Sequence, residues 1–255
     1  MSAGLNAFSL DGKLALVTGG GTGIGLGIAA AFTEAGATVI ITGRREEVLK
    51  DACKVLGEKA HYLVCDLAVL SNIPALVTSI ESKWGSIDIL VNNAGIHLKK
   101  WAQDTTDIEF ANIIQTNLLS VFALTREVAK SMIIRKTGSI ILISSMAGLF
   151  GIDRVSAYGT SKTALIGLMN NLVTEYSKDN VRINCIAPGW IASDMFFNAI
   201  NADPERKQKI TNRIAMPDFG KPEDVGNAAV FLSSRAARYV TGVVLPVDGG
   251  ASVNF

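Results

Sequence analysis

Tyr158 and Lys162, four residues apart, form a pair whose types and spacing can do chemistry. They fall in residues 156–178, whose pattern predicts a helix, and positions i and i+4 are neighbours on one face of a helix. A nearby ammonium favours the phenolate and lowers the pKa of a tyrosine, so the pair is suited to exchanging protons with a carbonyl or an alcohol. The same spacing is also common on helix surfaces, so other parts of the chain must decide between the two interpretations.

A glycine-rich turn at residues 19–25, Gly-Gly-Gly-Thr-Gly-Ile-Gly, is a candidate phosphate site. An apolar run at 13–18 predicts a buried strand before it, and an alanine-rich stretch at 26–35 predicts a helix after it. This order is the setting of a dinucleotide fingerprint, because glycines let the backbone approach a phosphate and the helix N-terminus favours negative charge. A merely flexible turn is the alternative, and the flanking elements favour cofactor binding. The predicted cofactor contacts are Gly19, Gly21, Thr22, Gly23, Ile24 and Gly25.

The second predicted strand, residues 38–42, ends in a way that bears on the choice of cofactor. Gly43, Arg44 and Arg45 stand where a carboxylate commonly holds the ribose hydroxyls of NAD. Since the planar guanidinium matches a phosphate, we predict that NADP(H) is preferred through Arg44 and Arg45 and that NAD(H) is possible. The alternative is that both arginines are solvated charges that pair with the glutamates following them.

Polar residues recur where further predicted strands end. Ligands of doubly wound sheets bind beyond the carboxyl ends of the strands, so these residues are expected to meet at one crevice. Asp66 either accepts from an adenine amino group or caps a following turn, and the Asn92-Asn93 pair either braces the cofactor loop or forms a plain turn. The strands and the residues that end them are 60–65 with Asp66, 87–91 with Asn92, 139–144 with Ser145 and 182–186 with Pro188.

Strands and helices alternate along the whole chain, which predicts an α/β fold. We expect a single domain over residues 1–255, a Rossmann-type doubly wound parallel sheet flanked by helices. Asn117 lies inside the long predicted helix 106–136, where asparagine is unfavourable, so either a buried amide or a functional kink is expected there. Residues 194–217 have the least regular pattern, and a flexible substrate loop is expected at about 190–217. The other predicted elements are helices at 71–84 and 222–234 and a last strand at 243–247.

Composition narrows the class of protein. The chain has 255 residues, is 49% hydrophobic and 18% charged, and carries a formal net charge of +1. This is a soluble globular composition, and the near-neutral charge predicts neither a nucleic-acid nor a membrane partner. Three widely spaced cysteines in apolar surroundings indicate a reducing compartment, and two histidines cannot make a His-rich metal site, so no metal is predicted. With no signal-like segment at residues 1–13, a cytoplasmic protein is expected.

The chain resembles the short-chain dehydrogenase/reductase family over nearly its whole length. The family's Thr-Gly-x-x-x-Gly-x-Gly matches residues 18–25, its Asn-Asn-Ala-Gly matches 92–95 and its Tyr-x-x-x-Lys matches 158–162. The family's serine, thirteen residues before the tyrosine, selects Ser145 over Ser144. Its tetrad asparagine matches Asn117. The segment that holds the nicotinamide carboxamide matches Pro188, Gly189, Ile191 and Ser193, with serine where the family more often has threonine.

This resemblance implies a role for each catalytic residue. Tyr158 is the general acid in reduction and the base in oxidation, and Lys162 lowers its pKa and binds the nicotinamide ribose. Ser145 donates to the substrate oxygen, and Asn117 orders a water that relays protons to Lys162. The implied reaction interconverts a secondary alcohol and a ketone by hydride transfer. Further cofactor contacts implied by position are Asp66, Leu67, Asn93, Ala94 and Gly95, together with Tyr158 and Lys162 themselves.

The resemblance extends to substrate class and assembly. Residues 73–76, 85–90 and 153–158 are similar to sugar-acid members such as gluconate 5-dehydrogenase and 2-deoxygluconate dehydrogenase, although 3-oxoacyl-carrier-protein reductases share much of the same frame. A non-catalytic NADP-binding sensor or scaffold is the alternative from another class. Family members are usually homotetramers, which is expected here. His97, Lys99 and Arg154 either hold a carboxylate of the substrate or are solvated charges. An apolar lid, which would also fit an acyl substrate, is expected from Trp190, Met195, Phe196 and Phe197. The expected substrate residues are His97, Ser145, Arg154, Tyr158, Trp190 and Met195.

Overall fold

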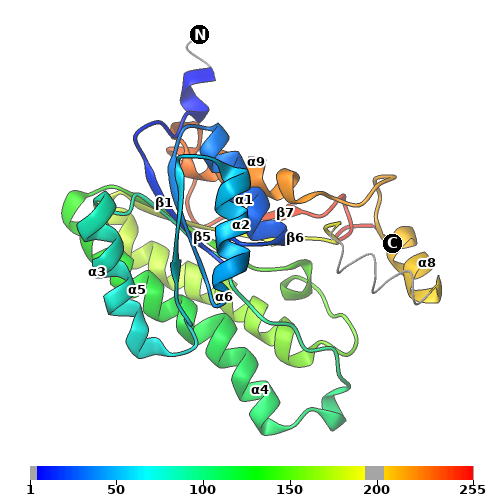
Figure 1. The fold of residues 1–255 in the computed structure, drawn as a ribbon. Coiled ribbons are helices and arrows are strands. Elements are labelled where there is room, and N and C mark those ends of the chain that lie inside the picture. The colour runs from blue at the N-terminus through cyan, green and yellow to red at the C-terminus, as the bar shows by residue number, and fades with distance from the viewer. Residues whose placement is uncertain (1–4, 193–203, 255) are drawn as a thin grey trace.

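Seven parallel strands form one twisted sheet in the order β3-β2-β1-β4-β5-β6-β7 (Figure 1). The structure is a computed structural model that describes residues 5–192 and 204–254. The predicted fold class, a Rossmann-type doubly wound parallel sheet flanked by helices, is confirmed. The strands are β1 (Leu14–Thr18), β2 (Thr38–Gly43), β3 (Ala60–Val64), β4 (Ile89–Asn92), β5 (Gly138–Ile143), β6 (Val181–Pro188) and β7 (Val244–Val247).

Two helical layers cover the two faces of the sheet, which explains why its central strands are continuous apolar runs. All five residues of β1 are buried, and because side chains alternate along a strand, Leu16 packs in one core and Val17 in the other. The first core includes α3 (Ile73–Trp84), α5 (Ser120–Arg135) and α6 (Ser156–Tyr176); the second includes α1 (Gly23–Glu34), α2 (Glu46–Leu56) and α9 (Pro222–Ser233).

The strand order reverses between β1 and β4. The chain leaves β1 toward β2 on one side, whereas β4 continues toward β5 on the other. The loops after β1 and β4 therefore diverge at the carboxyl edge of the sheet, the place where doubly wound folds bind their ligands.

The single helix predicted at 106–136 is interrupted. It consists of α4 (Asp107–Ile114), a π-helical turn (Gln115–Leu119) and α5, with Asn117 fully buried in the turn. By length and composition alone the helical run from Asp107 to Arg135 could cross a bilayer, but core helices pass the same test, and 39% of its apolar window is buried. Since α5 packs its buried side chains against the sheet, core packing accounts for much of this apolar content.

Part of the segment predicted as an irregular loop is helical. Within residues 190–217 the structure has α8 (Pro204–Arg213), which the sequence analysis missed. A proline suits the first position of a helix because its fixed φ fits and its missing N–H would have had no helical partner. Ile210 is buried, so α8 rests on the body of the domain. The predicted residues Ser193, Met195, Phe196 and Phe197 lie outside the described residues.

Candidate active site

The glycine turn has a backbone that only glycine fits easily. Gly19 and Gly23 have φ values of 65° and 53°, in the left-handed region that other residues adopt rarely. A Cβ atom on Gly25 would overlap the Gly19 carbonyl and the side-chain amide of Asn93. Thr22 then ends the turn in extended backbone, and α1 begins at Gly23. The turn therefore keeps its backbone open to an incoming phosphate.

Hydrogen bonds between the ends of β1 and β4 hold this turn in place. The Asn93 side-chain amide donates to the carbonyls of Thr18, at 2.8 Å, and Gly19, at 3.3 Å. The Thr18 hydroxyl accepts from the backbone N–H groups of Asn93 and Ala94, both at 2.9 Å. The bracing role predicted for this pair is confirmed for Asn93. Asn92 instead donates to Thr125 inside the core, at 3.0 Å.

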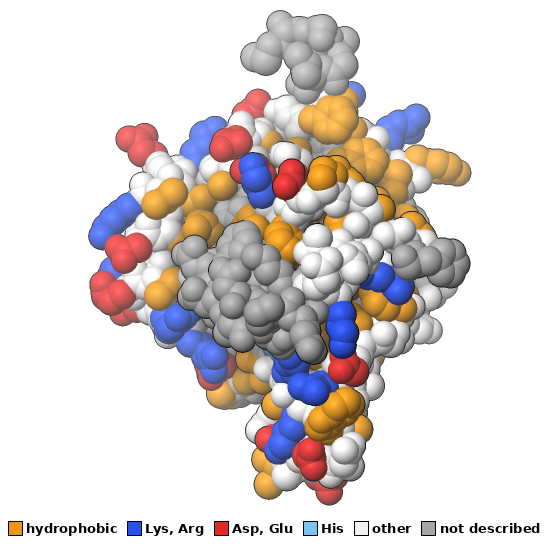
Figure 2. Space-filling model, turned by 90° about the vertical axis from the view of Figure 1, so that its right-hand side faces the viewer, with side chains coloured by type: hydrophobic (Ala, Val, Ile, Leu, Met, Phe, Trp, Pro, Cys, Tyr) orange, Lys and Arg blue, Asp and Glu red, His pale blue; other side chains and the backbone are white. Residues whose placement is uncertain are grey.

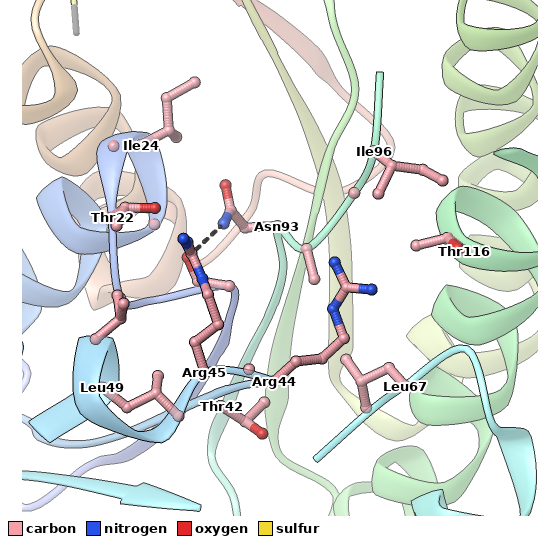
Figure 3. A pocket seen from close by; sticks show the side chains of 18 of the residues that line it. Thr22, Ile24, Thr42, Arg44, Arg45, Leu49, Leu67, Asn93, Ile96 and Thr116 are labelled. Carbon is pink, nitrogen blue, oxygen red and sulfur yellow. Dashed lines mark hydrogen bonds between the residues drawn. The ribbon is translucent and has the colours of Figure 1, made fainter. Parts of the chain in front are cut away.

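A cavity of about 740 Å³ opens over the braced turn. Arg44 and Arg45 extend into it, Arg45 on the side of Thr22 and Arg44 on the side of Leu67 (Figure 3). The cavity is large enough for a dinucleotide-sized ligand. Its described lining is Gly19, Gly21–Gly25, Thr42–Arg45, Val48, Leu49, Cys65–Ala68, Asn93–Ile96, Thr116, Ser120, Ile191 and Pro222.

The two arginines are not neutralised by the glutamates that follow them. The Lys50 ammonium lies 3.5 Å from the Glu46 carboxylate and 2.8 Å from that of Glu47. Lys50 forms ion pairs with both carboxylates. The guanidinium groups of Arg44 and Arg45 can therefore interact with a ligand in the cavity. An open glycine cradle next to two cations fits a dinucleotide with an additional phosphate, which is the chemistry that distinguishes NADP from NAD.

Asp66 and Leu67 line the cavity beyond β3. The Asp66 carboxylate accepts from the backbone N–H of Ala68 at 3.0 Å, so it caps the following turn. This is one of the two alternatives left open by the sequence. A carboxylate has further acceptor positions, so capping leaves Asp66 able to accept from a ligand amino group as well.

Ser145 and Tyr158 meet at the carboxyl end of β5. Ser145 comes two residues after the end of β5, and its Oγ accepts from Ala147 N at 3.1 Å at the start of a short 3₁₀ turn. The Ser145 hydroxyl is hydrogen-bonded to the Tyr158 phenol. Lys162, one turn along α6, is buried at 5% exposure, and its Nζ lies 5.6 Å from the centre of the Tyr158 ring.

The predicted effect of Lys162 on Tyr158 is not what the structure shows. Burial raises the pKa of Tyr158, and the Ser145 hydrogen bond offsets this only in part. Burial also lowers the pKa of Lys162 to about 8. The physical reason is that both side chains are buried, so desolvation disfavours the charged form of each, while the Lys162 ammonium donates to the Ile143 carbonyl at 2.8 Å. In this state Tyr158 is held in its protonated form at neutral pH.

Asn117 is held by three hydrogen bonds within the π-helical turn. Its Oδ1 accepts from Ile96 N at 2.8 Å, and its Nδ2 donates to the carbonyl of Ile96 at 2.9 Å and to the Ser161 hydroxyl at 3.1 Å. A Cβ atom on Gly95 would lie 3.1 Å from Asn117 Oδ1 and 3.6 Å from Lys162 Nζ. Asn117 and Lys162 therefore converge on Gly95, which lies next to the cofactor cavity.

The predicted substrate residues separate into two groups. The His97 ring lies against the Tyr158 ring, with centroids 4.6 Å apart. Arg154 and Trp190 line a different cavity. Arg154 has a left-handed backbone, with φ of 63°, and its guanidinium stacks over Trp101 at 4.6 Å. Of the residues predicted for the nicotinamide end, Ile191 lines the cofactor cavity, and Gly189 donates to the Val247 carbonyl at 3.0 Å.

Some lining residues of both cavities were missed by sequence reasoning. Thr116 and Ser120 reach the cofactor cavity from the π-helical turn and the start of α5, and Lys209 and Arg213 reach the second cavity from α8. The sequence signal that could have predicted α8 is Pro204 followed by a charged stretch with a single isoleucine, Ile210. Nothing local in the sequence indicates that α8 lies against residues 150–155.

Comparison with known proteins places these features in a family. Residues 19–252 match the family model described as Enoyl-(Acyl carrier protein) reductase. The chain is 37% identical over 250 residues to the 2-dehydro-3-deoxy-D-gluconate 5-dehydrogenase of Dickeya dadantii (strain 3937), covering 96% of this chain and 98% of that protein. It is also 37% identical over 245 residues to the 3-oxoacyl-(acyl-carrier-protein) reductase FabG of Chlamydia muridarum (strain MoPn / Nigg), covering 94% and 98%.

Solved structures agree with these matches. The crystal structure of a gluconate 5-dehydrogenase from Burkholderia cenocepacia J2315 in complex with NADP and tartrate superposes with a TM-score of 0.93 at 31% identity, over 99% of this chain and all of that one. Sequence and structure therefore agree over almost the full length, and the chain belongs to the short-chain dehydrogenase/reductase family of NAD(P)-dependent oxidoreductases.

Proposed function

We propose that the protein uses NADP(H) to interconvert a secondary alcohol and a ketone on a small sugar acid. The observation that carries this proposal is the meeting of Ser145, Tyr158 and Lys162 beside a dinucleotide-sized cavity that holds two arginines. When bound, the nicotinamide would supply or accept the hydride. The protein's own residues supply alignment and the proton.

Tyr158 is the group that moves the proton. In reduction its Oη–H donates to the ketone oxygen as that oxygen gains negative charge, and in oxidation the phenolate Oη accepts the alcohol proton. Burial keeps the phenol protonated at neutral pH, which prepares it for the reductive direction. The Ser145 hydroxyl, already hydrogen-bonded to the phenol, orients the substrate oxygen toward it.

Lys162 and Asn117 support this proton transfer without contacting the substrate oxygen themselves. With a pKa of about 8, Lys162 gains and loses a proton close to neutral pH, so it can restore the proton that Tyr158 gives up. Asn117 is fixed by three hydrogen bonds beside Gly95 and Lys162, where it can orient a water. The presence of all four residues favours an enzyme over a sensor or scaffold without turnover.

A sugar acid is favoured over an acyl thioester by charge and by resemblance. Arg154 and Lys99 line the second cavity, and such cations suit an acidic substrate. The solved gluconate 5-dehydrogenase carries tartrate, a small hydroxylated acid, together with NADP. A 3-oxoacyl-(acyl-carrier-protein) reductase activity is the second candidate, because the identity to that reductase is equally high.

We also infer a homotetramer in the cytoplasm. The three cysteines are free, and two of them are buried, which suits a reducing compartment. Exposed apolar side chains on and beside α4 and α5, among them Phe110 and Phe122, offer a face that a second copy could cover. Sedimentation velocity on the purified protein tests the assembly: a tetramer is expected, and a monomer at micromolar concentration would contradict it.

A substrate panel tests the activity. The purified protein is assayed with D-gluconate and 2-dehydro-3-deoxy-D-gluconate as alcohols and with a 3-oxoacyl group on acyl-carrier protein as ketone, each with NADP(H) and NAD(H). We expect the highest kcat/KM for a sugar acid with NADP(H). A preference for the carrier-bound thioester would select the second candidate. Tight NADPH binding without turnover of any panel member would favour the sensor.

A further inference from the structure

A second cavity, with a volume of about 580 Å³, lies beside the candidate active site. That volume is typical of sites for small molecules. Its described lining is rich in cations: Lys99, Arg154, Lys209 and Arg213 are basic, and Asp153 alone is acidic. Lys and Arg side chains are grouped on the face of the molecule that carries α8 (Figure 2).

This cavity adjoins the catalytic tyrosine by two routes. Val155, in its wall, precedes Tyr158 by three residues, so the two Cα atoms are at most about 11 Å apart. On the other side, His97 lies against the Tyr158 ring, and Lys99, two residues further on, lines the cavity. Residues that line the cavity are therefore close in sequence to Tyr158 and to the residue that contacts its ring.

Two contacts hold the Arg213 side chain in place. Its Nε donates to the Ala251 carbonyl at 2.9 Å, and its guanidinium carbon lies 4.8 Å from the centre of the Phe150 ring. The hydrogen bond uses Nε and the ring contact uses the flat face, so the edge with the two Nη groups is the part that can meet a two-oxygen acceptor. A guanidinium held in this way loses little entropy on binding a carboxylate.

Among the described residues that line the cavity, four side chains are basic and one is acidic. Asp153 lies 3.9 Å from Arg154 Nε, and Arg154 is further occupied by stacking on Trp101. Within the described lining this leaves Arg213 and Lys209 without a carboxylate partner. A concave site with a surplus of positive charge concentrates small anions.

We propose that this cavity is the carboxylate subsite of the enzyme, in which Arg213 and Lys209 bind the acid group of the substrate while its carbinol meets Tyr158. The inference rests on the proposed sugar-acid function and adds the residues that determine the specificity. The concave shape of the cavity favours a small carboxylate over the convex surface of an acidic carrier protein. A polyol with a hydroxymethyl group in place of the carboxylate has no negative charge for these cations to bind.

Calorimetric titration of the protein saturated with NADPH tests the subsite without turnover, because an alcohol substrate cannot react with the reduced cofactor. The probes are D-gluconate and D-glucitol, which differ only at the terminal carboxylate. We expect Arg213→Gln to weaken D-gluconate by at least about tenfold, as for loss of a charged hydrogen bond. Arg213→Lys should recover part of this affinity, and D-glucitol should bind all variants within about twofold of wild type.

Two further variants provide a second test of the subsite and a control for the loss of charge. Lys209→Gln changes an exposed side chain and should weaken D-gluconate by about threefold even if Arg213→Gln disturbs folding. Arg238→Gln removes an equal charge from an exposed position beyond α9 and should leave both affinities unchanged.

The outcomes separate the subsite from the activity. No binding of D-gluconate to wild type, an unchanged affinity in the Arg213 and Lys209 variants, or equal losses for D-gluconate and D-glucitol would overturn the subsite. Arg213-dependent binding of D-gluconate that the enzyme does not oxidise with NADP⁺ would support the subsite and reject D-gluconate as substrate. If the Arg213 and Lys209 variants instead lose only the reduction of a 3-oxoacyl carrier protein in steady-state assays, the subsite is overturned in favour of protein docking.

Discussion

The cofactor half and the substrate half of the crevice are built on different physical principles. Around the cofactor cavity the backbone itself is the binding surface: left-handed glycines open it, and Asn93 and Thr18 tie the ends of β1 and β4 together. Around the second cavity, cationic side chains come from residues 99, 154, 209 and 213, three regions that are far apart in the sequence. The first half can serve any substrate, whereas the carboxylate subsite that we propose in the second half would determine which substrate fits.

Lys162 assists the proposed proton transfer whichever substrate is bound, so replacing it should have the largest effect on activity. We expect Lys162→Met to reduce kcat by at least about 100-fold, in line with loss of assisted proton transfer. The same change should raise the free energy of unfolding at pH 7 by up to about 3 kcal/mol, because a pKa lowered from 10.5 to about 8 means that the fold pays to bury the ammonium. Denaturant unfolding with parallel assays checks both effects.

The pH dependence of stability gives an independent readout of the buried lysine. Between about pH 8 and 10.5 the unfolded chain keeps the Lys162 proton that the folded protein has lost, so this group's contribution to stability rises with pH over that window. The rise should be present in wild type and absent in Lys162→Met. A variant that is less stable than wild type at pH 7 would contradict the assignment of a strained buried charge.

Replacing Arg44 tests whether this residue binds the 2′-phosphate that distinguishes NADP from NAD. We expect Arg44→Ala to weaken NADPH by about 10- to 100-fold, the usual effect of losing a hydrogen bond to a charged group, and NADH by less than about twofold. Fluorescence titration with both cofactors measures this, with the exposed Arg235→Ala as the charge control. Equal losses for the two cofactors would remove Arg44 from the 2′-phosphate.

The difference between the halves also explains what could be predicted from the sequence. Gly19–Gly25, Asn93 and Tyr158 act through local backbone geometry or fixed helical spacing, and these are visible in a short stretch of sequence. The break at Asn117 was foreseen as one of two alternatives, because asparagine is unfavourable inside a helix.

Other features depend on long-range contacts that no local pattern carries. The pKa of Tyr158 is raised because burial by several elements outweighs the effect of the Ser145 hydrogen bond. The position of Arg213 depends on Phe150 and Ala251, which are distant in sequence. The capping role of Asp66 was equally open until the direction of the following turn was known.

The left-handed residues Arg154 and Lys136 allow a matched test with a smaller effect. Their φ values are 63° and 52°, but Arg154 stacks on Trp101 whereas Lys136 is an exposed helix end. We expect Lys136→Gly to stabilise the fold by about 1 kcal/mol through relief of backbone strain. Arg154→Gly should change stability by less than about 0.5 kcal/mol, because loss of the cation–π contact offsets the same relief. Equal stabilisation in thermal unfolding would show that the Trp101 contact contributes nothing.

The most direct test of the account is Tyr158→Phe, with turnover and NADPH binding measured on the same preparation. The hydroxyl is the only group removed, and the ring that packs against His97 remains. The account predicts a loss in kcat of about 10³-fold or more, the upper range for a general acid, with the Kd for NADPH within about twofold of wild type. Activity within tenfold of wild type would contradict the role of Tyr158 as the proton donor.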